Sequence, residues 1–299
     1  MGVMSVSANT NEGDTGERLK ELRELLSPCR LCPRQCEVDR LSGERGFCRI
    51  GAEALMSSAG PHFGEEPPLV GSGGSGTIFF AGCNLGCVFC QNHDISHGLE
   101  GNPISPSRLA DVMLYLQKRG CHNINVVTPT HVVPWIVEAL SLARSRGLNL
   151  PLVYNCGGYE SVETLRLLDG LVDIYMPDFK FADSAPAERF AQAPDYPETA
   201  MAALKEMHRQ VGDLDTVTGV AKRGLLVRHL VMPAGVAGSR KVIDFLAGQI
   251  SPHTAVNVMA QYRPCYRAYD YEEIARRPSF DEFTDAYNYA VDRGLRLLR

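Results

Sequence analysis

The chain has 299 residues and a formal net charge of −5, with 30 Lys and Arg against 35 Asp and Glu. Its basic residues are scattered, which excludes the clustered charge of a nucleic-acid-binding surface, and no apolar run is long enough to cross a membrane. The first residues lack the charged start and apolar stretch of a signal peptide, so we predict a cytoplasmic protein. The ten cysteines then indicate metal or redox chemistry and not disulfide bonds.

The N-terminal part of the chain divides into a tail, a helix and a Cys-rich extension. Residues 1–16 are polar and lack periodicity, which predicts a disordered tail. Residues 17–26 place four leucines on one helical face, and Pro28 ends that helix. The helix and the Cys-rich stretch after it form an N-terminal extension over residues 17–70.

From residue 71 to residue 299 the pattern alternates between strands and helices. Short apolar runs predict strands at 77–81, 124–127, 152–154, 172–175, 225–231 and 256–259. Helical periodicity predicts helices at 106–119, 133–146, 162–168, within 184–211, at 240–250, near 271–276 and at 280–293. This alternation predicts parallel βα units in an α/β core. Six units are fewer than the eight of a closed barrel, so an open, partial (β/α)6 TIM-like barrel fits best.

The run from Gly71 to Gly76 fits the spacing of a dinucleotide-binding fingerprint. Such a fingerprint must follow a strand and open a helix, whereas this run precedes the strand expected at 77–81. We therefore predict a turn that leads into the sheet.

Three cysteines, Cys83, Cys87 and Cys90, follow the first predicted strand with the spacing C-x3-C-x2-C. This spacing matches neither bacterial nor plant-type ferredoxins, and it fits paired zinc-binding units poorly. The neighbouring loop residues supply no fourth thiolate. Three thiolates hold three corners of a [4Fe–4S] cube and leave one iron open to another ligand.

A second set of four cysteines, Cys29, Cys32, Cys36 and Cys48, lies in the N-terminal extension. Four thiolates in twenty residues suit one metal centre. Zinc in a closed structural site and a second iron–sulfur cluster both fit the spacing, and four free thiols are the simpler alternative.

The remaining candidate ligands have simpler interpretations. Cys121, Cys156 and Cys265 are expected to be small buried residues, although the last two lie near predicted strand ends, where a redox role is an alternative. His93 and His97 share a helical face if their segment is helical, but loop histidines that hydrogen-bond to backbone are commoner than a metal pair.

The three-cysteine loop resembles that of the radical S-adenosylmethionine (SAM) enzymes. The resemblance implies a partial barrel of the radical SAM type, a cluster held by Cys83, Cys87 and Cys90, and SAM on the open iron. It also places Phe89 near the adenine. The runs 60–68, 82–92, 123–131, 154–159, 175–180, 227–233 and 256–265 resemble those of pyruvate formate-lyase activating enzyme-like proteins, which are similar to glycyl radical enzyme activases but mostly have unsettled substrates.

The same resemblance suggests residues for SAM. The Thr128–Thr130 turn stands where relatives have a Gly-Gly-Glu segment whose backbone meets the amino group of SAM. Asn155 stands where activating enzymes place an Asp. Asp178 and Lys180 end the next strand, and Lys180 can reach a carboxylate or make a solvated ion pair. Arg228 lies on the arginine-bearing fifth strand as an anchor for SAM or substrate.

We therefore predict an enzyme that cleaves SAM reductively and abstracts a hydrogen atom from a protein or peptide, with activation of a glycyl radical enzyme as the favoured case. The expected partners are SAM, that substrate, and a reducing donor such as flavodoxin or ferredoxin. One alternative is radical SAM modification of another peptide or small molecule. Another is a non-catalytic metal-binding protein, either an iron–sulfur electron carrier or a structural zinc protein.

Overall fold

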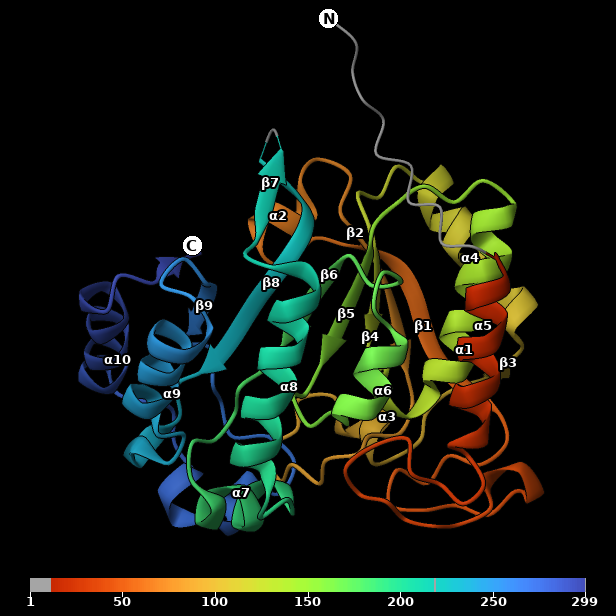
Figure 1. Cartoon of the computed structure of the whole chain (residues 1–299). Coiled ribbons are helices and arrows are strands. Elements are labelled where there is room, and N and C mark those ends of the chain that lie inside the picture. The colour runs from red at the N-terminus through yellow and green to blue at the C-terminus, as the bar shows by residue number, and fades with distance from the viewer. Residues whose placement is uncertain (1–11, 218, 299) are drawn as a thin grey trace, which may run out of the picture.

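The computed structural model describes residues 12–217 and 219–298 (Figure 1). Its centre is a ten-stranded sheet with the order β10-β9-β8-β6-β5-β4-β2-β1-β3, and β7 pairs with the side of β8. From β2 to β10 the neighbours on this path are parallel, whereas β1, β3 and β7 pair antiparallel. The strands are β1 Ala54–His62, β2 Ser75–Phe80, β3 Asn102–Ile104, β4 Ile124–Val127, β5 Leu152–Cys156, β6 Ile174–Pro177, β7 Asp215–Val217, β8 Val220–Leu230, β9 Ala255–Met259 and β10 Arg296–Leu297.

The longer helices cover one face of this sheet, with α1 packed outside α5 and α6 (Figure 1), and Leu69 of α2 packs against Val153, Ile174 and Met176 on the other face. The α-helices are α1 Glu12–Glu24, α2 Pro67–Val70, α3 His93–Ser96, α4 Pro106–Lys118, α5 Val133–Ser145, α6 Val162–Leu167, α7 Ser184–Ala191, α8 Tyr196–Val211, α9 Ser239–Phe245 and α10 Phe280–Asp292. Helix α4 shows why these segments are helical. Ser105 caps its first turn by accepting a hydrogen bond from the Arg108 amide at 3.4 Å. Its buried residues recur with helical spacing.

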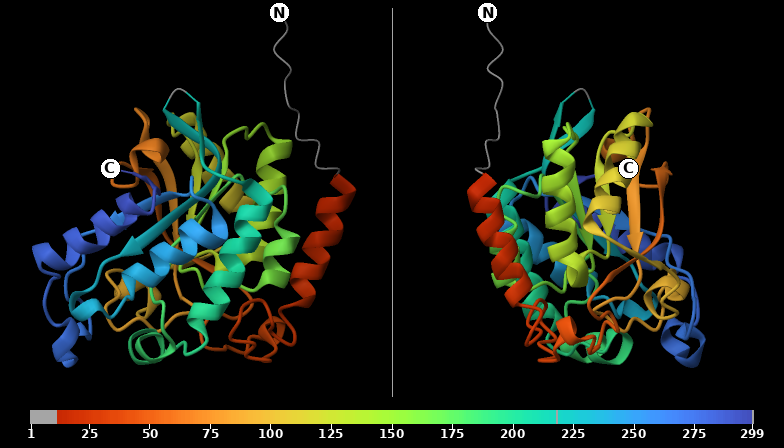
Figure 2. Two further views of the ribbon diagram at one scale, coloured as in Figure 1. Left: turned by 60° about the vertical axis from the view of Figure 1, so that its left-hand side comes forward. Right: turned by 90° about the vertical axis from the view of Figure 1, so that its right-hand side faces the viewer.

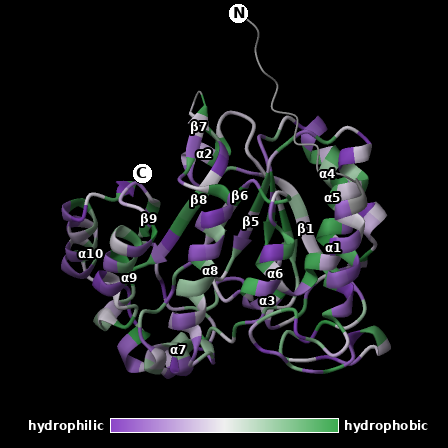
Figure 3. Cartoon of the chain, viewed as in Figure 1, coloured by the Kyte–Doolittle hydropathy of each residue, from purple (hydrophilic) through white to green (hydrophobic). Residues whose placement is uncertain are grey.

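The six predicted strands are confirmed, and they lie in the sheet in their sequence order as β2, β4, β5, β6, β8 and β9. Strands β5 and β6 are buried along their whole length, as expected when a parallel sheet is covered on both faces. The strand path does not close on itself within the described residues, which agrees with a partial barrel. Hydrophobic residues concentrate in this sheet and hydrophilic ones on the outer helix surfaces (Figure 3).

Several predicted boundaries were wrong. Helix α1 begins at Glu12, so residues 12–16 are not part of a tail, and residues 1–11 lie outside the described part of the chain. The helix expected at 240–250 is α-helical only to Phe245 and then widens into a π-turn. The helix expected near 271–276 is a single 3-10 turn at Glu272–Ile274. Strand β8 begins at Val220, five residues before the predicted start, because it also pairs with β7.

Strand β1 was not predicted, since Gly60 and Pro61 interrupt its pattern, but it positions part of the site. It runs antiparallel to β2 and pairs His62 with Ser75, at the amino end of the parallel strands. The chain then continues through Glu65 and Glu66 into α2, which packs against β8. From the amino end of β2 this segment turns into the cavity that also contains the cysteine loop, where the Glu65 carboxylate lies 3.3 Å from Arg228 Nη1.

The glycine-rich run is a turn before β2, as predicted. Gly71 and Gly74 adopt positive φ angles of 46° and 82°, which glycine permits without steric cost. The amides of Ser72 and Gly73 donate to Nε2 of His122 at 3.1 and 3.0 Å, so a side chain of the protein occupies these donors. No helix in the described residues combines the length and apolar character needed to span a bilayer.

Candidate active site at the carboxyl ends of the strands

A cavity of about 450 Å³ opens at the carboxyl ends of the parallel strands, where parallel α/β folds build their sites. It brings together the three motif cysteines and most of the residues that the sequence suggested for SAM. Its lining includes Cys83, Cys87, Phe89, Cys90, Thr128, Asn155, Cys156, Asp178, Lys180 and Arg228, together with Glu65 and His62 from the β1 side.

The cysteine loop follows directly from β2. The Ala81 amide donates to Leu55 O of β1 at 2.8 Å, and the buried His131 ring places Nε2 2.8 Å from Ala81 O. Further along, the amides of Gly86 and Val88 each donate at 2.9 Å to the carbonyls of Ala191 and Phe190. The loop is therefore held on both sides before any ligand binds.

The chemistry of these thiols suits a cluster. Burial raises the pKa of Cys83 to about 12 and that of Cys87 further, so the protein alone does not stabilise their thiolates. The Leu85 amide nevertheless points at Cys83 Sγ, 3.4 Å away, as a donor to a thiolate would. In the described part of the chain, no three His, Cys, Asp or Glu side chains converge on one metal-ion position. A cube does not require such convergence, because each of its thiolates binds a different iron.

A buried charge network stands beside the cysteines in the same cavity. Arg228 Nε donates to Asp178 Oδ1 at 2.8 Å, and Lys180 Nζ donates to the other oxygen, Oδ2, at 2.5 Å. Arg228 Nη2 also donates to Asn155 Oδ1 at 2.7 Å. Asp178, Lys180 and Arg228 each have a side-chain exposure of 20% or less. The four residues predicted from three separate strand ends thus form one connected network.

The ionisation of this network is set by its partners. Burial alone would raise the pKa of Asp178, but the charges of Arg228 and Lys180 outweigh burial and lower it to about 2. Burial opposes the charge on Lys180, yet Asp178 and then Cys87 raise its pKa above the usual value. The carboxylate and both cations are therefore charged at neutral pH, and Lys180 is electrostatically coupled to a motif cysteine.

Glu65 is a site residue that sequence reasoning missed. Its carboxylate lies 3.3 Å from Arg228 Nη1 and is 8% exposed, and burial raises its pKa. The neighbouring Glu66 accepts a hydrogen bond from Asn257 at 2.8 Å, while its second oxygen is buried without a partner. The only sequence signal for Glu65 was its place in the run 60–68, which carried the family resemblance without a role.

The remaining predicted residues divide between the cavity and its support. Phe89 lines the cavity and packs edge-on against Phe181, with ring centroids 5.9 Å apart. Thr128 lines it with a positive φ of 56°, a strained conformation for a β-branched residue. Thr130 lies behind the cavity lining, where its hydroxyl donates to the buried Glu160 at 2.6 Å.

Glu160 was not singled out in the sequence. Its second oxygen accepts from Tyr154 at 3.0 Å, and burial raises its pKa to about 7. Tyr154 lies on β5 and Thr130 follows β4, so the Glu160 carboxyl connects these two neighbouring segments through its hydrogen bonds.

The expectation of a buried residue holds for Cys121 and Cys156, although Cys156 also lines the cavity, and it is wrong for Cys265, which is partly buried. All ten cysteines are free. His93 lies in helix α3 and not in a loop. His97 lies 3.3 Å from Cys87 O through Nε2. His93 and His97 stack on Tyr266, with centroids 5.1 and 4.9 Å from that ring.

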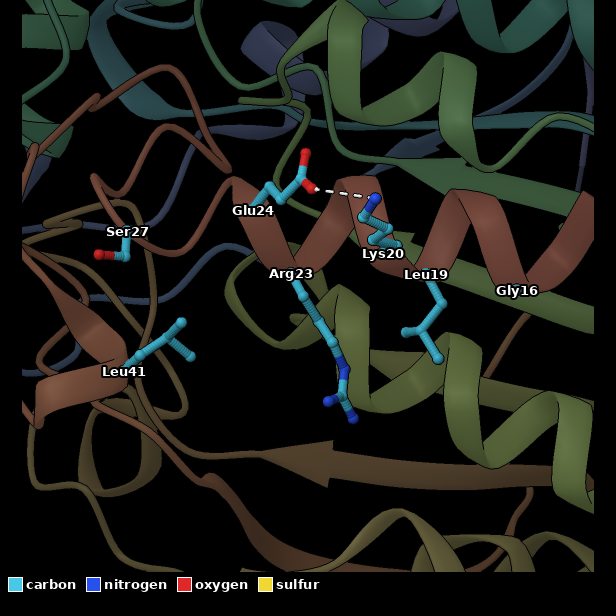
Figure 4. Close-up of a pocket in the computed structure, with 7 residues that line it drawn as sticks. All are labelled: Gly16, Leu19, Lys20, Arg23, Glu24, Ser27 and Leu41. Atoms are coloured by element: carbon cyan, nitrogen blue, oxygen red, sulfur yellow. Dashed lines mark ion pairs between the residues drawn. The ribbon is translucent and has the colours of Figure 1, made fainter.

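A second cavity, of about 690 Å³, lies against α1 (Figure 4). Leu19 and Arg23 extend from the same side of α1, and Lys20 pairs with Glu24 at 3.9 Å (Figure 4). None of its described lining residues is a cysteine, a histidine or an aromatic residue, so the cavity at the strand ends is the better candidate site.

Comparison with known proteins agrees with this choice. A family model described as the radical SAM superfamily matches residues 77–221, which include the cysteine loop and the ends of β4, β5 and β6. The protein MJ0674 of Methanocaldococcus jannaschii is 34% identical over 286 residues, covering 92% of this chain and 78% of that protein. MJ0808 of the same organism is 22% identical over 298 residues, covering 90% and 79%.

Among solved structures, Streptococcus suis SuiB bound to S-adenosylmethionine superposes with a TM-score of 0.50 and 12% identity, over 72% of this chain. The chain spans 47% of SuiB, so this likeness concerns the fold alone. The matched residues and the cysteine loop at the first strand end show that residues 77–221 of this chain carry a radical SAM superfamily domain.

Proposed function

We propose that this radical SAM enzyme cleaves SAM reductively and abstracts a hydrogen atom from a protein or peptide, with the Cα hydrogen of a glycine in a glycyl radical enzyme as the favoured target. The chemistry that a bound [4Fe–4S] cluster and SAM supply is one-electron cleavage of the sulfonium to a 5′-deoxyadenosyl radical. The protein's part is to bind, orient and shield the reacting groups.

One observation carries this proposal: three thiols and a buried cation–carboxylate network line the same cavity. Cys83, Cys87 and Cys90 would hold three corners of the cluster. Lys180 and Arg228 present cations for the carboxylate of SAM, and Asp178 with Asn155 present oxygens for its amino group. Phe89 is placed for the adenine.

The choice of a protein or peptide substrate has two supports. The strand path does not close within the described residues, so the cavity has a side that a substrate loop can enter. The sequence runs quoted above resemble those of activating enzymes. The replacements at Thr128, Thr130 and Asn155 distinguish this chain from those enzymes, so its partner is expected to differ as well.

The test begins with SAM cleavage. Anaerobically reconstituted protein with dithionite and SAM should form methionine and 5′-deoxyadenosine in equal amounts, measured by liquid chromatography and mass spectrometry. The Cys83→Ala, Cys87→Ala, Cys90→Ala triple variant should form neither. Intact cluster without either product would favour the electron-carrier alternative.

The substrate is tested separately. Mixing the reduced enzyme and SAM with a candidate glycyl radical enzyme should produce a glycyl radical signal by electron paramagnetic resonance (EPR). With a partner deuterated at glycine Cα, the deuterium should appear in 5′-deoxyadenosine. Deuterium-free 5′-deoxyadenosine and no glycyl signal would shift the assignment to another peptide or a small molecule.

A further inference from the structure

The proposed function makes no use of Cys29, Cys32, Cys36 and Cys48, yet the fold gathers them at the carboxyl end of the sheet (Figure 2). Three of these cysteines are only 7–8% exposed. The Cys29 amide donates to Val38 O at 2.9 Å and the Glu37 amide to Cys29 O at 3.0 Å, which brings Cys36 back beside Cys29. A side chain at Gly46 would lie 2.7 Å from Cys36 Sγ, so the segment before Cys48 passes against the same thiol.

The sulfur atoms of this segment are hydrogen-bond acceptors. Cys36 Sγ accepts from the Phe47 amide at 3.3 Å. Burial raises the pKa of the Cys32 and Cys48 thiols, and the backbone amides of Arg34 and Ile50 oppose that rise. Cys83 in the motif loop likewise accepts from the Leu85 amide. Amides that point at sulfur stabilise thiolate ligands and tune iron–sulfur clusters, so the N-terminal thiols share a local geometry with the motif cysteine.

The two cysteine segments are also in direct contact. A Cβ on Gly82, next to Cys83, would lie 2.8 Å from Cys48 O. Arg34 bridges them, because its Nε donates to Asn84 O at 2.9 Å while its guanidinium stacks over Phe47 at 3.7 Å. The Nη2 of Arg34 is buried without a partner. A cation with a free donor thus links the two cysteine segments.

We infer that Cys29, Cys32, Cys36 and Cys48 hold a second [4Fe–4S] cluster, adjacent to the first, that passes one electron to it. The electron comes from a low-potential one-electron carrier, so the carrier is oxidised by one electron and the motif-loop cluster is reduced by one. The relay role rests on the proposed function, whereas the cluster assignment does not.

A closed zinc site is the competing assignment for four cysteines. Zinc needs four ligands at about 2.3 Å from one ion, and within residues 12–217 and 219–298 no three candidate side chains converge in that way. Neighbouring thiols that do not converge on one ion suit the separate corners of a cube, where each binds its own iron. With all four corners bound by protein, such a cluster has no open iron for SAM, which fits electron transfer and not catalysis.

Metal content tests the assignment on the full chain, purified anaerobically. Iron, sulfide and zinc are measured for wild type, for the Cys83→Ala, Cys87→Ala, Cys90→Ala variant, and for the Cys29→Ser, Cys32→Ser, Cys36→Ser, Cys48→Ser variant. Wild type should hold about eight irons, and each variant about half of that. The buried Cys121→Ala variant is the matched control and should keep the full amount. One zinc per wild-type chain, lost from the N-terminal variant, would overturn the assignment.

The N-terminal variant can fail to fold, and the motif variant then decides. Its reduced EPR spectrum should show one cluster that does not respond to SAM, whereas a folded, iron-free motif variant overturns the inference.

For the relay, fully reduced wild type should show broader EPR lines than a reduced N-terminal or motif variant, through spin coupling of neighbouring clusters. Unbroadened lines in a protein with both clusters would refute the relay. Neither iron content nor line width depends on SAM cleavage, so failure here is distinct from failure of the proposed function.

Discussion

The two cysteine segments lie side by side at one end of the sheet but have different surroundings. The motif loop has three thiols, and they face a cavity with charged side chains from β6 and β8. The N-terminal segment has four; Cys29, Cys32 and Cys48 are buried, and the sulfur of the less buried Cys36 accepts from the Phe47 amide. The number of thiols and the access to charged groups together distinguish a centre that binds a further ligand from one that is closed.

The largest expected effect comes from removing the three thiols of the motif loop. Replacing Cys83, Cys87 and Cys90 by Ala should abolish 5′-deoxyadenosine formation, because we propose those thiols as the ligands of the reacting cluster. The Cys121→Ala variant, which removes a buried thiol that does not line the cavity, should keep wild-type turnover in the same assay. Product formation by the triple variant would move the reacting centre to the N-terminal segment.

Removing Arg228 should have the next largest effect. An Arg228→Met variant leaves Asp178 with Lys180 alone and Glu65 without its cation. Breaking a buried ion pair from one side costs about 3–5 kcal/mol, and SAM affinity should fall too. Chemical denaturation and isothermal titration calorimetry measure the two effects. Arg240, which makes an exposed pair with Asp285, is the matched control, and Arg240→Met should leave both unchanged.

The sequence predicted the site more completely than its support. Parallel strands place their carboxyl ends on one rim, so the order of βα units was enough to bring Asn155, Asp178 and Arg228 together. The position of Glu65 depends on β1, an antiparallel strand whose Gly60 and Pro61 hide its periodicity. The link between Thr130 and Glu160 depends on side-chain packing behind the rim, which sequence spacing does not encode.

Glu160, behind the cavity lining, and Asp178, within the cavity, should affect the pH dependence of stability differently. The raised pKa of Glu160, about 7, means that the folded state holds its proton more tightly than the unfolded chain does. Its contribution is therefore complete below the unfolded pKa of about 4.3 and is lost as pH rises through 7, by about 3 kcal/mol. Asp178, with a pKa of about 2, adds no slope in this range.

A Glu160→Gln variant should therefore flatten the fall in unfolding free energy between pH 5 and pH 8, measured by denaturant titration at each pH. The same change at the exposed Glu100 should leave the slope as in wild type. An unchanged slope in Glu160→Gln would mean that this carboxyl is ionised throughout that range.

The smallest expected effects concern the contact between the two segments. Arg34→Met removes the hydrogen bond to Asn84 O and leaves that carbonyl unpaired, at a cost of about 1–3 kcal/mol. Arg49 reaches the carbonyls of Ser96 and His97 from an exposed position, and Arg49→Ala should change thermal stability little. Equal effects of the two variants would argue against a tight contact through Arg34.

The most direct measurement is the EPR spectrum of the reduced protein with and without SAM. Wild type should show a cluster signal whose shape changes when SAM is added, and the motif triple variant should show no such change. Wild-type spectra that are identical with and without SAM, in protein that contains its full iron, would contradict an open cluster corner at Cys83, Cys87 and Cys90.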